Sequence, residues 1–378
     1  MNVRKLVIAA ALAAGFSMPV MAQTDTGGST AVTPWPAFLQ EANEVFRADY
    51  SYVAPNDVDG DGISDILWYN AAKNQVGYWL TAYTDSDLFP YPYALGAKKV
   101  FNVPAGYYVG AVGDLNGDRM VDLVLTNANR NLYLWASNGA GFDSTHIGTY
   151  PEGWQLLGAG DIDGDNNADL LWWNDSKCEF GYWRMQGATV LERKVIKATC
   201  GYHVAGFGHF LRSNHLDLLW TSDAHDVYLW AGTDSGFTST FLGNYDPQGH
   251  IIGTALAGDG GGINVYVQND AAMQFTQYEW VRYYDQQGNV GLTTFNAIRS
   301  LPINQGDYLG ATGNMDGANE AVLLWGNDTA NAATTPKALG RLTWYTSTYG
   351  AFTPGSNIWQ ATAIASYPAG WALLGSGH

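Results

Sequence analysis

The pentapeptide Asp114-Leu115-Asn116-Gly117-Asp118 recurs along the chain at a regular interval. Close copies begin at Asp57 (DVDGD) and Asp161 (DIDGD), and in each case another aspartate and an apolar run follow eight residues after the start. Weaker copies lie at 209–220 and 314–325, with a very degenerate one near 256–266. Successive starts are therefore about 47 to 58 residues apart, a spacing typical of propeller blades and similar arrays.

Within each repeat the hydrophobic pattern has the period of two that is typical of β-strands. The repeat that begins at Tyr107 divides into four short strands, over 107–112, 122–126, 132–136 and 145–150. Four-stranded units in series favour a radial array, which leaves few sheet edges exposed. We therefore predict an all-β fold, a β-propeller of four-stranded blades. Six repeats are counted, and seven blades are the alternative.

The C-terminus indicates how the ring closes. Residues 370–377 (GWALLGSG) match residues 153–160 (GWQLLGAG) and stop where a further loop would begin. We expect this last strand to join the first blade. A seventh blade completed from the N-terminal segment is the alternative, for which residues 23–50 look too short.

The N-terminus has the features of a removable export signal. Arg4 and Lys5 precede an uncharged apolar run over 6–16, and Val20-Met21-Ala22 offers the small residues that a signal peptidase needs. The run is shorter than the roughly 20 residues that span a bilayer. We expect a Sec-type signal peptide over 1–22, a leader segment over 23–49 and the propeller over 50–378. The mature protein would be secreted, periplasmic or at the cell surface, with no transmembrane segment.

Composition agrees with short strands and tight turns. The chain has 45 Gly, 15 Trp, 23 Tyr and 14 Phe, whereas only 14% of its residues are charged. The formal net charge is −17, and nucleic-acid binding would need a basic stripe that is absent from the sequence.

The three well-preserved loops carry oxygen ligands at positions 1, 3, 5, 7 and 9, with a backbone carbonyl at position 7. Several carboxylates and one carbonyl form the donor set that calcium prefers. The predicted ligands are Asp57, Asp59, Asp61, Ile63 and Asp65 in the first loop, Asp114, Asn116, Asp118, Met120 and Asp122 in the second, and Asp161, Asp163, Asp165, Asn167 and Asp169 in the third.

These loops differ from EF-hands, which need a glutamate at position 12 and flanking helices. Trp68, Leu125 and Trp172 occupy that position, within predicted strands. A single loop of this composition could be an ordinary turn, but three at one repeat position favour metal. We predict about three calcium ions, with weaker binding in the second loop because Asn116 replaces an aspartate.

The loops, the following Leu-Leu-Trp strands and segments such as Gly181-Tyr182-Trp183 resemble FG-GAP and VCBS repeats, the bacterial relatives of the integrin α-chain propeller. The resemblance covers roughly 50–378. It implies a propeller, usually of seven blades, with calcium in certain loops and a role in adhesion, carbohydrate binding or exported enzymes. The literal F-G…G-A-P string is absent. The fourth loop (His209, Leu211, Ser213) and the sixth (Ala318, Val322) lack ligands and are expected to stay unfilled.

The two cysteines, Cys178 and Cys200, flank a predicted hairpin over 179–197. In an oxidising compartment such a pair favours a disulfide.

Most tryptophans recur at equivalent repeat positions, which indicates packing between blades more than ligand binding; Trp35, Trp173 and Trp359 do not recur. His203, His209 and His215 match no metal motif.

No catalytic motif is found. We therefore expect a non-enzymatic calcium-binding propeller that binds a protein or glycan ligand. The alternatives are an exported polysaccharide lyase or hydrolase on a propeller frame, with an insertion in the fifth or sixth repeat, and a structural component of an exported complex.

Overall fold

The computed structural model describes the greater part of the repeat region. The described residues are 38–41, 45–46, 52–53, 56–83, 93–211, 213–256, 262–284, 290–292, 294–313, 322–327, 340–347, 359–368 and 370–374. The expected signal peptide (1–22), most of the expected leader (23–49) and the sixth loop at 314–321 lie outside these residues.

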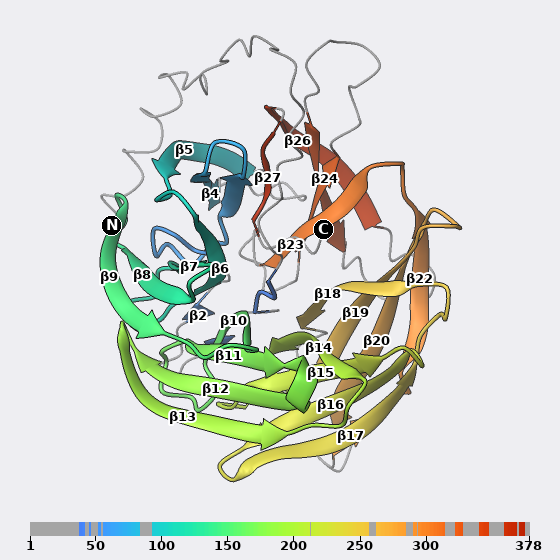
Figure 1. Ribbon diagram of the computed structural model, residues 1–378. Helices are drawn as coiled ribbons and strands as arrows, with labels where there is room; N and C mark the ends of the chain where they lie inside the picture. Colours follow the sequence, from blue (N-terminus) through green and yellow to red (C-terminus); the bar gives the residue numbers. More distant parts are fainter. Residues whose placement is uncertain are drawn as a thin grey trace.

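Among these residues, six antiparallel sheets surround a central axis, and each corresponds to one repeat of the sequence (Figure 1). The fifth sheet has an additional strand, because β20 pairs with β21 at one end and with β22 along the rest of its length. The predicted all-β propeller of four-stranded blades is confirmed. Beside these sheets, the described residues form one two-stranded sheet, β1 (Val45–Phe46) with β2 (Tyr52–Val53).

Except in the first blade, the strands follow one another in space as they do in the sequence, from the axis outward (Figure 1). Blade 1 consists of β27 (Ala372–Leu373), β3 (Ile66–Asn70), β4 (Gln75–Tyr83) and β5 (Tyr93–Asn102). Blade 2 consists of β6 (Tyr107–Gly113), β7 (Asp122–Asn127), β8 (Asn131–Ser137) and β9 (Phe142–Thr149). Blade 3 consists of β10 (Gln155–Gly160), β11 (Asp169–Asn174), β12 (Glu179–Gln186) and β13 (Thr189–Lys197), with the short 3-10 helix η1 (Asp175–Lys177) between β11 and β12.

The second half of the ring has the same plan. Blade 4 consists of β14 (Tyr202–Gly208), β15 (Asp217–Ser222), β16 (Asp226–Thr233) and β17 (Gly236–Asn244). Blade 5 consists of β18 (His250–Leu256), β19 (Gly262–Asn269), β20 (Gln274–Tyr284), β21 (Val290–Leu292) and β22 (Asn296–Pro302). Blade 6 consists of β23 (Asp307–Gly313), β24 (Val322–Asn327), β25 (Gly340–Ser347) and β26 (Trp359–Tyr367).

The ring is closed by its C-terminal strand, as the sequence predicts. β27 pairs with β3 in blade 1 through Ala372 with Tyr69 and Leu373 with Trp68. The N–H of Leu374 adds a hydrogen bond of 2.9 Å to the carbonyl of Leu67. The red β27 accordingly lies beside the blue strands of the first blade (Figure 1). The first blade is therefore assembled from both ends of the repeat region.

The second strand of each blade forms the core between neighbouring sheets. All residues of β3 and β11 are buried, because the sheets of two blades cover both of their faces. The outermost strand β13 is mostly exposed. This difference explains why the second strands read as continuous Leu-Leu-Trp runs while the outer strands contain charged residues.

Glycine recurs in the innermost strands, where each faces the next blade. Strand register shifts occur beside Gly158, Gly206 and Gly253, as expected for β-bulges. A Cβ atom on Gly206 would lie 2.4 Å from Oγ1 of Thr254 in the neighbouring blade. The missing side chain therefore lets inner strands converge at the axis.

A short N-terminal segment, Phe38–Glu41, occupies part of this axis. The N–H of Leu39 donates to the carbonyl of Leu157 in blade 3 at 2.7 Å, and Glu41 forms a parallel bridge with Phe207 in blade 4. Phe38 is buried in the hydrophobic cluster of blades 1 and 2. Part of the segment expected to be a leader thus lies within the propeller.

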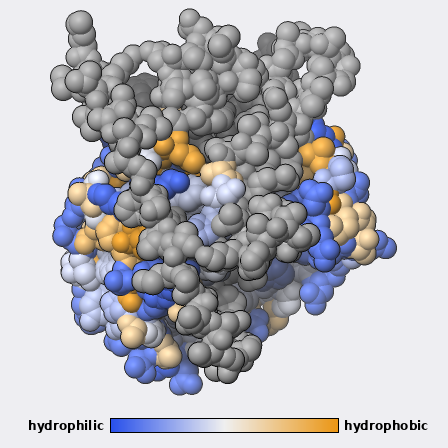
Figure 2. Space-filling model, turned by 90° about the horizontal axis from the view of Figure 1, so that it is seen from above, coloured by the Kyte–Doolittle hydropathy of each residue, from blue (hydrophilic) through white to orange (hydrophobic). Residues whose placement is uncertain are grey.

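On the described part of the face shown in Figure 2, hydrophilic and hydrophobic residues are interspersed instead of forming one broad apolar surface. Within the described ranges no helix is long and apolar enough to cross a membrane.

Candidate metal centre and cavities

The three aspartate-rich loops lie at equivalent places, immediately before the buried second strands β3, β7 and β11. All fifteen predicted ligand residues are among the described residues. Each loop also contacts the following blade or loop. The N–H of Val121 in the second loop donates to the carbonyl of Asp57 in the first at 2.5 Å, and Ala168 in the third donates to Asp114 in the second at 2.7 Å. The first three loops are therefore joined in series.

The aspartate at position 1 organises each loop through backbone hydrogen bonds. The carboxylate of Asp57 accepts from the N–H groups of Gly60 and Gly62 at 2.7 and 2.8 Å. The corresponding carboxylates of the other loops also accept from positions 4 and 6. Asp114 accepts from Gly117 and Arg119, and Asp161 accepts from Gly164 and Asn166. Positions 4 and 6 have positive φ in all three loops, which explains the glycine at position 4. At position 6 the first loop has Gly62, whereas Arg119 and Asn166 adopt the same conformation in the other two loops.

The aspartate at position 5 accepts a hydrogen bond from the N–H of position 7 in every loop. The distances are 2.9 Å for Ile63 to Asp61, 2.8 Å for Met120 to Asp118 and 2.9 Å for Asn167 to Asp165. The residues at position 7 whose carbonyls are predicted ligands are thus held beside the position 5 carboxylate.

The aspartates at position 9 are fully buried, and each accepts two backbone hydrogen bonds. Asp122 accepts from Leu115 at 3.0 Å and from Ser137 at 2.9 Å. The corresponding donors are Val58 and Thr81 to Asp65, Ile162 and Met185 to Asp169, and Leu211 and Gly232 to Asp217. Because the ligand-poor fourth loop has the same arrangement, position 9 fastens the loop to the third strand of its blade whether or not position 1 is an aspartate.

Burial raises the pKa of these carboxyl groups. It raises the pKa of Asp57 to about 7, of Asp161 to about 6, and of Asp122 and Asp169 each to about 8. The pKa of Asp65 is also raised, chiefly by burial. Neighbouring carboxylates of the same loop raise the pKa values of Asp57, Asp65, Asp122 and Asp169 further, while backbone N–H groups lower them. The pKa of Asp161 is lowered by His209 and by backbone N–H groups and raised by Glu41. A cation in the loop would oppose this effect by stabilising the charged forms.

The donor groups fit a hard cation best in the first and third loops. Oxygens of Asp57, Asp59 and Asp61 lie within 4.8 Å of one another, as do oxygens of Asp161, Asp163 and Asp169. The Oδ1 atom of Asp163 is buried without a hydrogen-bond partner, so it has a lone pair for a ligand. An all-oxygen set of this kind suits calcium. These residues would hold the ion, which would supply positive charge and crosslink the loop.

The second loop has a different local structure. All its residues are described, yet no three of its acidic side chains form such a group. The amide of Asn116 instead donates to Asp118 at 3.0 Å. Asn116 therefore lowers the number of carboxylates in the loop, and its amide forms a hydrogen bond with one of the carboxylates that remain.

Two groups that bear on the loops have no motif in the sequence. Arg184 on β12 forms ion pairs with Asp163 and Asp165 of the third loop. Glu41 of the N-terminal segment lies 3.3 Å from His209 in the fourth. Both depend on strand register and on the path of a distant segment, which the loop pattern does not show.

The other two histidines of the sequence pattern, His203 and His215, have separate surroundings. His215 contacts Asp234 at 2.9 Å, whereas His203 lines a cavity beside the N-terminal segment at the axis of the propeller. Among the described residues, the acidic groups close enough to hold a metal include no histidine.

The cysteines are joined. Cys178 follows η1 in a left-handed conformation with φ of 50°, and a disulfide links it to Cys200 after β13. It connects the turn of blade 3 to the segment that enters blade 4.

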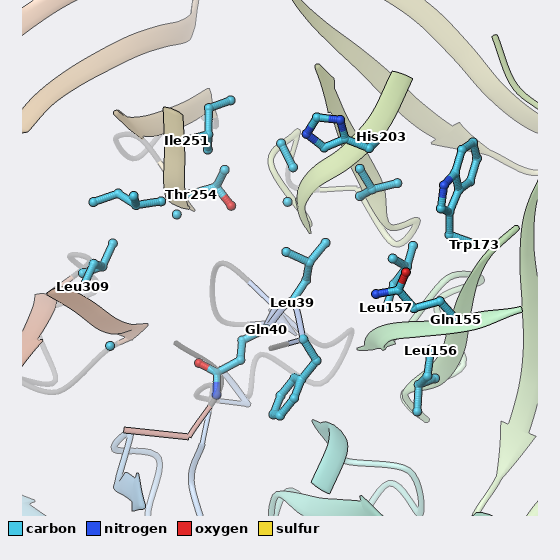
Figure 3. A pocket seen from close by; sticks show the side chains of 17 residues that line it. Leu39, Gln40, Gln155, Leu156, Leu157, Trp173, His203, Ile251, Thr254 and Leu309 are labelled. Carbon is cyan, nitrogen blue, oxygen red and sulfur yellow. The ribbon is translucent and has the colours of Figure 1, made fainter. Parts of the chain in front are cut away.

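A cavity of about 330 Å³ remains in the channel beside the N-terminal segment. Figure 3 shows Leu39 and Gln40 on one side, with Thr254 and Leu309 across the cavity and His203 and Trp173 at another edge. Trp173, one of the tryptophans outside the repeat pattern, is thus placed at the cavity, although it is largely buried.

A second cavity, of about 270 Å³, lies between blades 2 and 3. Its walls include the aromatic rings of Tyr150, Trp154, Trp172 and Trp183, with Arg193 and Lys194 at its edge. The guanidinium of Arg193 lies 4.2 Å from the centroid of the Trp183 ring.

A corresponding aromatic cluster lies at the junction of blades 6 and 1. It consists of Trp68, Trp79, Tyr367 and Trp371, and Lys98 lies 3.6 Å from the Trp79 ring.

Comparison with known proteins identifies the repeat. Residues 114–172 match the FG-GAP-like repeat family, so the protein carries an FG-GAP-like repeat on a β-propeller fold. This range holds the second and third loops. No match to a curated protein is found.

Solved propellers show only a distant similarity. The chain is 16% identical to the Tc holotoxin pore of Photorhabdus luminescens, with a TM-score of 0.46, over 82% of this chain and 16% of the toxin chain. It is 10% identical to a periplasmic gluconolactonase of Pseudomonas aeruginosa, with a TM-score of 0.40 and 88% of each chain covered. An oligogalacturonate lyase in complex with manganese is also 10% identical, with a TM-score of 0.40, over 80% of this chain and 75% of that one.

Proposed function

We propose that this protein is an exported binding module for a protein or glycan, built on a propeller whose aspartate loops are stabilised by calcium. The observation that carries the proposal is the repeated loop. The same oxygen-rich sequence occurs at the same place in three successive blades, and backbone hydrogen bonds join each loop to the next.

Calcium would act as a structural staple in this proposal. Carboxylates that lie a few ångströms apart repel one another when no cation is bound, and the loops connect the strands of a blade to the adjoining blade. A ligand that binds only the folded state at about a hundredfold excess over its Kd adds about 2.7 kcal/mol of stability per site.

Export is supported by two independent features, the N-terminal signal pattern and the Cys178–Cys200 disulfide. Disulfides persist in oxidising compartments and are rare in the cytosol.

Ligand binding is supported by the aromatic cavity between blades 2 and 3. Trp154 is partly exposed there, and neither Arg193 nor Lys194 forms an ion pair with the described residues. An aromatic cavity edged by two cations that stack on its rings or near them suits a sugar or a side chain that carries a carboxylate.

We propose that the protein is not an enzyme. The buried carboxyl groups with the most strongly raised pKa values among the described residues lie in the loops, where backbone N–H groups already occupy their oxygens. Release of product from a polysaccharide would overturn this part of the proposal.

Thermal unfolding tests the calcium staple. The melting temperature should rise in millimolar calcium, fall in chelator and respond little to magnesium. Asp57→Ala should remove part of the gain, and Asp316→Ala, in the loop expected to stay unfilled, should remove none. An unchanged melting curve for a sample shown to be metal-free in chelator would overturn the proposal. A glycan array, repeated with Trp154→Ala, tests the ligand independently.

A further inference from the structure

Arg184 brings a positive charge of the protein to the third aspartate loop. Its Nε atom forms an ion pair with Oδ2 of Asp163. Its Nη2 atom donates a hydrogen bond of 3.4 Å to Oδ2 of Asp165, and Nη1 lies 3.9 Å from Glu192. Asp163 and Asp165 are positions 3 and 5 of the loop, two of the predicted calcium ligands.

Blades 1, 2 and 4 have no cation at this position. The residue after Arg184, Met185, donates its N–H to the position 9 aspartate of the loop. Thr81, Ser137 and Gly232 make the same contact in blades 1, 2 and 4. The residues that precede them, and so correspond to Arg184, are Leu80, Ala136 and Ala231.

The guanidinium does not satisfy the loop completely. It contacts one oxygen of Asp163, while Oδ1 of the same carboxylate is buried without a hydrogen-bond partner. Asp163 also belongs to the group of three carboxylates that lie within 4.8 Å of one another. Arg184 and a metal ion would therefore both draw on the carboxylate of Asp163.

We infer that Arg184 is a built-in counter-ion of the third loop, which competes with calcium for Asp163 and Asp165. The inference rests on the proposed calcium binding of the loops. It follows that the third loop binds calcium more weakly than the first, although each has four aspartates. It also follows that the third loop keeps its conformation without metal better than the first, because Arg184 partly neutralises the repulsion between its carboxylates.

Replacement of Arg184 by the residue of the equivalent position in blade 1 tests the inference. In Arg184→Leu, the calcium site of the third loop, identified by calorimetry on the full mature chain as the site weakened by Asp163→Asn, should bind about tenfold more tightly, since one nearby positive charge is removed. A second substitution, Asp163→Asn, should abolish that gain. Lys197→Leu is the matched control. It removes one positive charge from the same blade, but the Lys197 ammonium pairs with Glu179 instead of a loop.

Thermal unfolding separates a counter-ion from a residue that only packs. Arg184→Leu should lower the melting temperature in chelator, and saturating calcium should reduce the difference from the native protein. An equal loss in chelator and in calcium would overturn the inference, as would an unchanged binding isotherm. If neither the native protein nor Arg184→Leu takes up calcium, the proposed function fails and the inference fails with it. Uptake by Arg184→Leu alone would support the inference in its strongest form.

Discussion

The Oε1 atom of Glu41 lies 3.3 Å from Nε2 of His209, and both side chains are largely buried. His209 occupies position 1 of the fourth loop, where the first three loops have an aspartate. Its Nδ1 atom lies 2.9 Å from the carbonyl oxygen of Ser213 at position 5. The imidazole thus connects two positions that a metal would connect in the other loops, and the N-terminal segment supplies the opposite charge.

This pair should stabilise the protein in a pH-dependent way. Burial alone would lower the pKa of His209, but Glu41 and the Ser213 carbonyl raise it to about 9. Because this value lies above the ordinary 6.5, the contribution is complete below about pH 6.5 and is lost as the pH rises through about 9. We expect Glu41→Gln to lower the free energy of unfolding by about 3 kcal/mol at pH 6. Urea unfolding at constant calcium concentration measures it.

The control for this prediction is the same comparison at pH 10, where the native protein and Glu41→Gln should differ far less. A difference that stays constant from pH 6 to 10 would show that Glu41 stabilises the axis by packing and not by its charge.

The aspartates at position 9 should be needed for folding even without metal. Asp122 is fully buried, and its two oxygens accept from Leu115 and Ser137. Asp122→Asn removes one acceptor and should cost about 1–3 kcal/mol in chelator. Asp118→Asn, at the more exposed position 5 of the same loop, is the matched variant and should change mainly the response to calcium. Chemical unfolding with and without calcium distinguishes the two, and equal effects in chelator would contradict the assignment.

The disulfide should contribute to stability without affecting metal binding. Cys178 and Cys200 are 22 residues apart, and a loop of that size corresponds to roughly 3 kcal/mol in the chain-entropy model. Cys178→Ser with Cys200→Ser should lower the melting temperature and leave the calcium isotherm unchanged. Thiol labelling of the unfolded, unreduced protein gives an independent check, because two free thiols would contradict the bond.

The sequence predicts those parts of the fold that repeat. The loop that begins at Asp114 and the following buried strand recur often enough to indicate four-stranded blades, and the match between 370–377 and 153–160 predicts the closing strand that pairs with β3. These features depend on the local hydrophobic pattern and on turn chemistry, and both recur in each copy of the repeat.

Contacts made only once were not predicted. Phe38–Glu41 reaches the axis through single contacts with several blades, and no repeated pattern marks it. Arg184 differs from the residues at the equivalent position of other blades only in residue type. Its contact with the loop follows from the register of β12, which the sequence does not show. Asp122 is a predicted calcium ligand that also fastens its loop to β8, and the second role depends on the N–H of Ser137, fifteen residues away. Such relationships become visible only when the strands are placed side by side.

Calcium binding should depend on pH in a range that is unusual for carboxylates. Burial raises the pKa of Asp57 to about 7 and of Asp169 to about 8, far above the ordinary 3.8. In the metal-free protein the folded state therefore binds more protons than the unfolded state between about pH 4 and 8. The free energy of unfolding in chelator should fall as the pH rises through that window.

Calcium reverses this dependence, because the ion must displace those protons to reach the carboxylates. Calcium affinity should therefore rise from pH 6 to 8 and level off above it. Calorimetry in buffers of different ionisation enthalpy should detect proton release on binding at pH 6.5 and little at pH 9. Asp57→Asn removes one of the groups and should reduce the release, whereas Asp234→Asn, a fully exposed carboxylate outside the three loops, should leave it unchanged. Affinity that does not vary between pH 6 and 8 would show that the loop carboxylates are already ionised before the metal arrives.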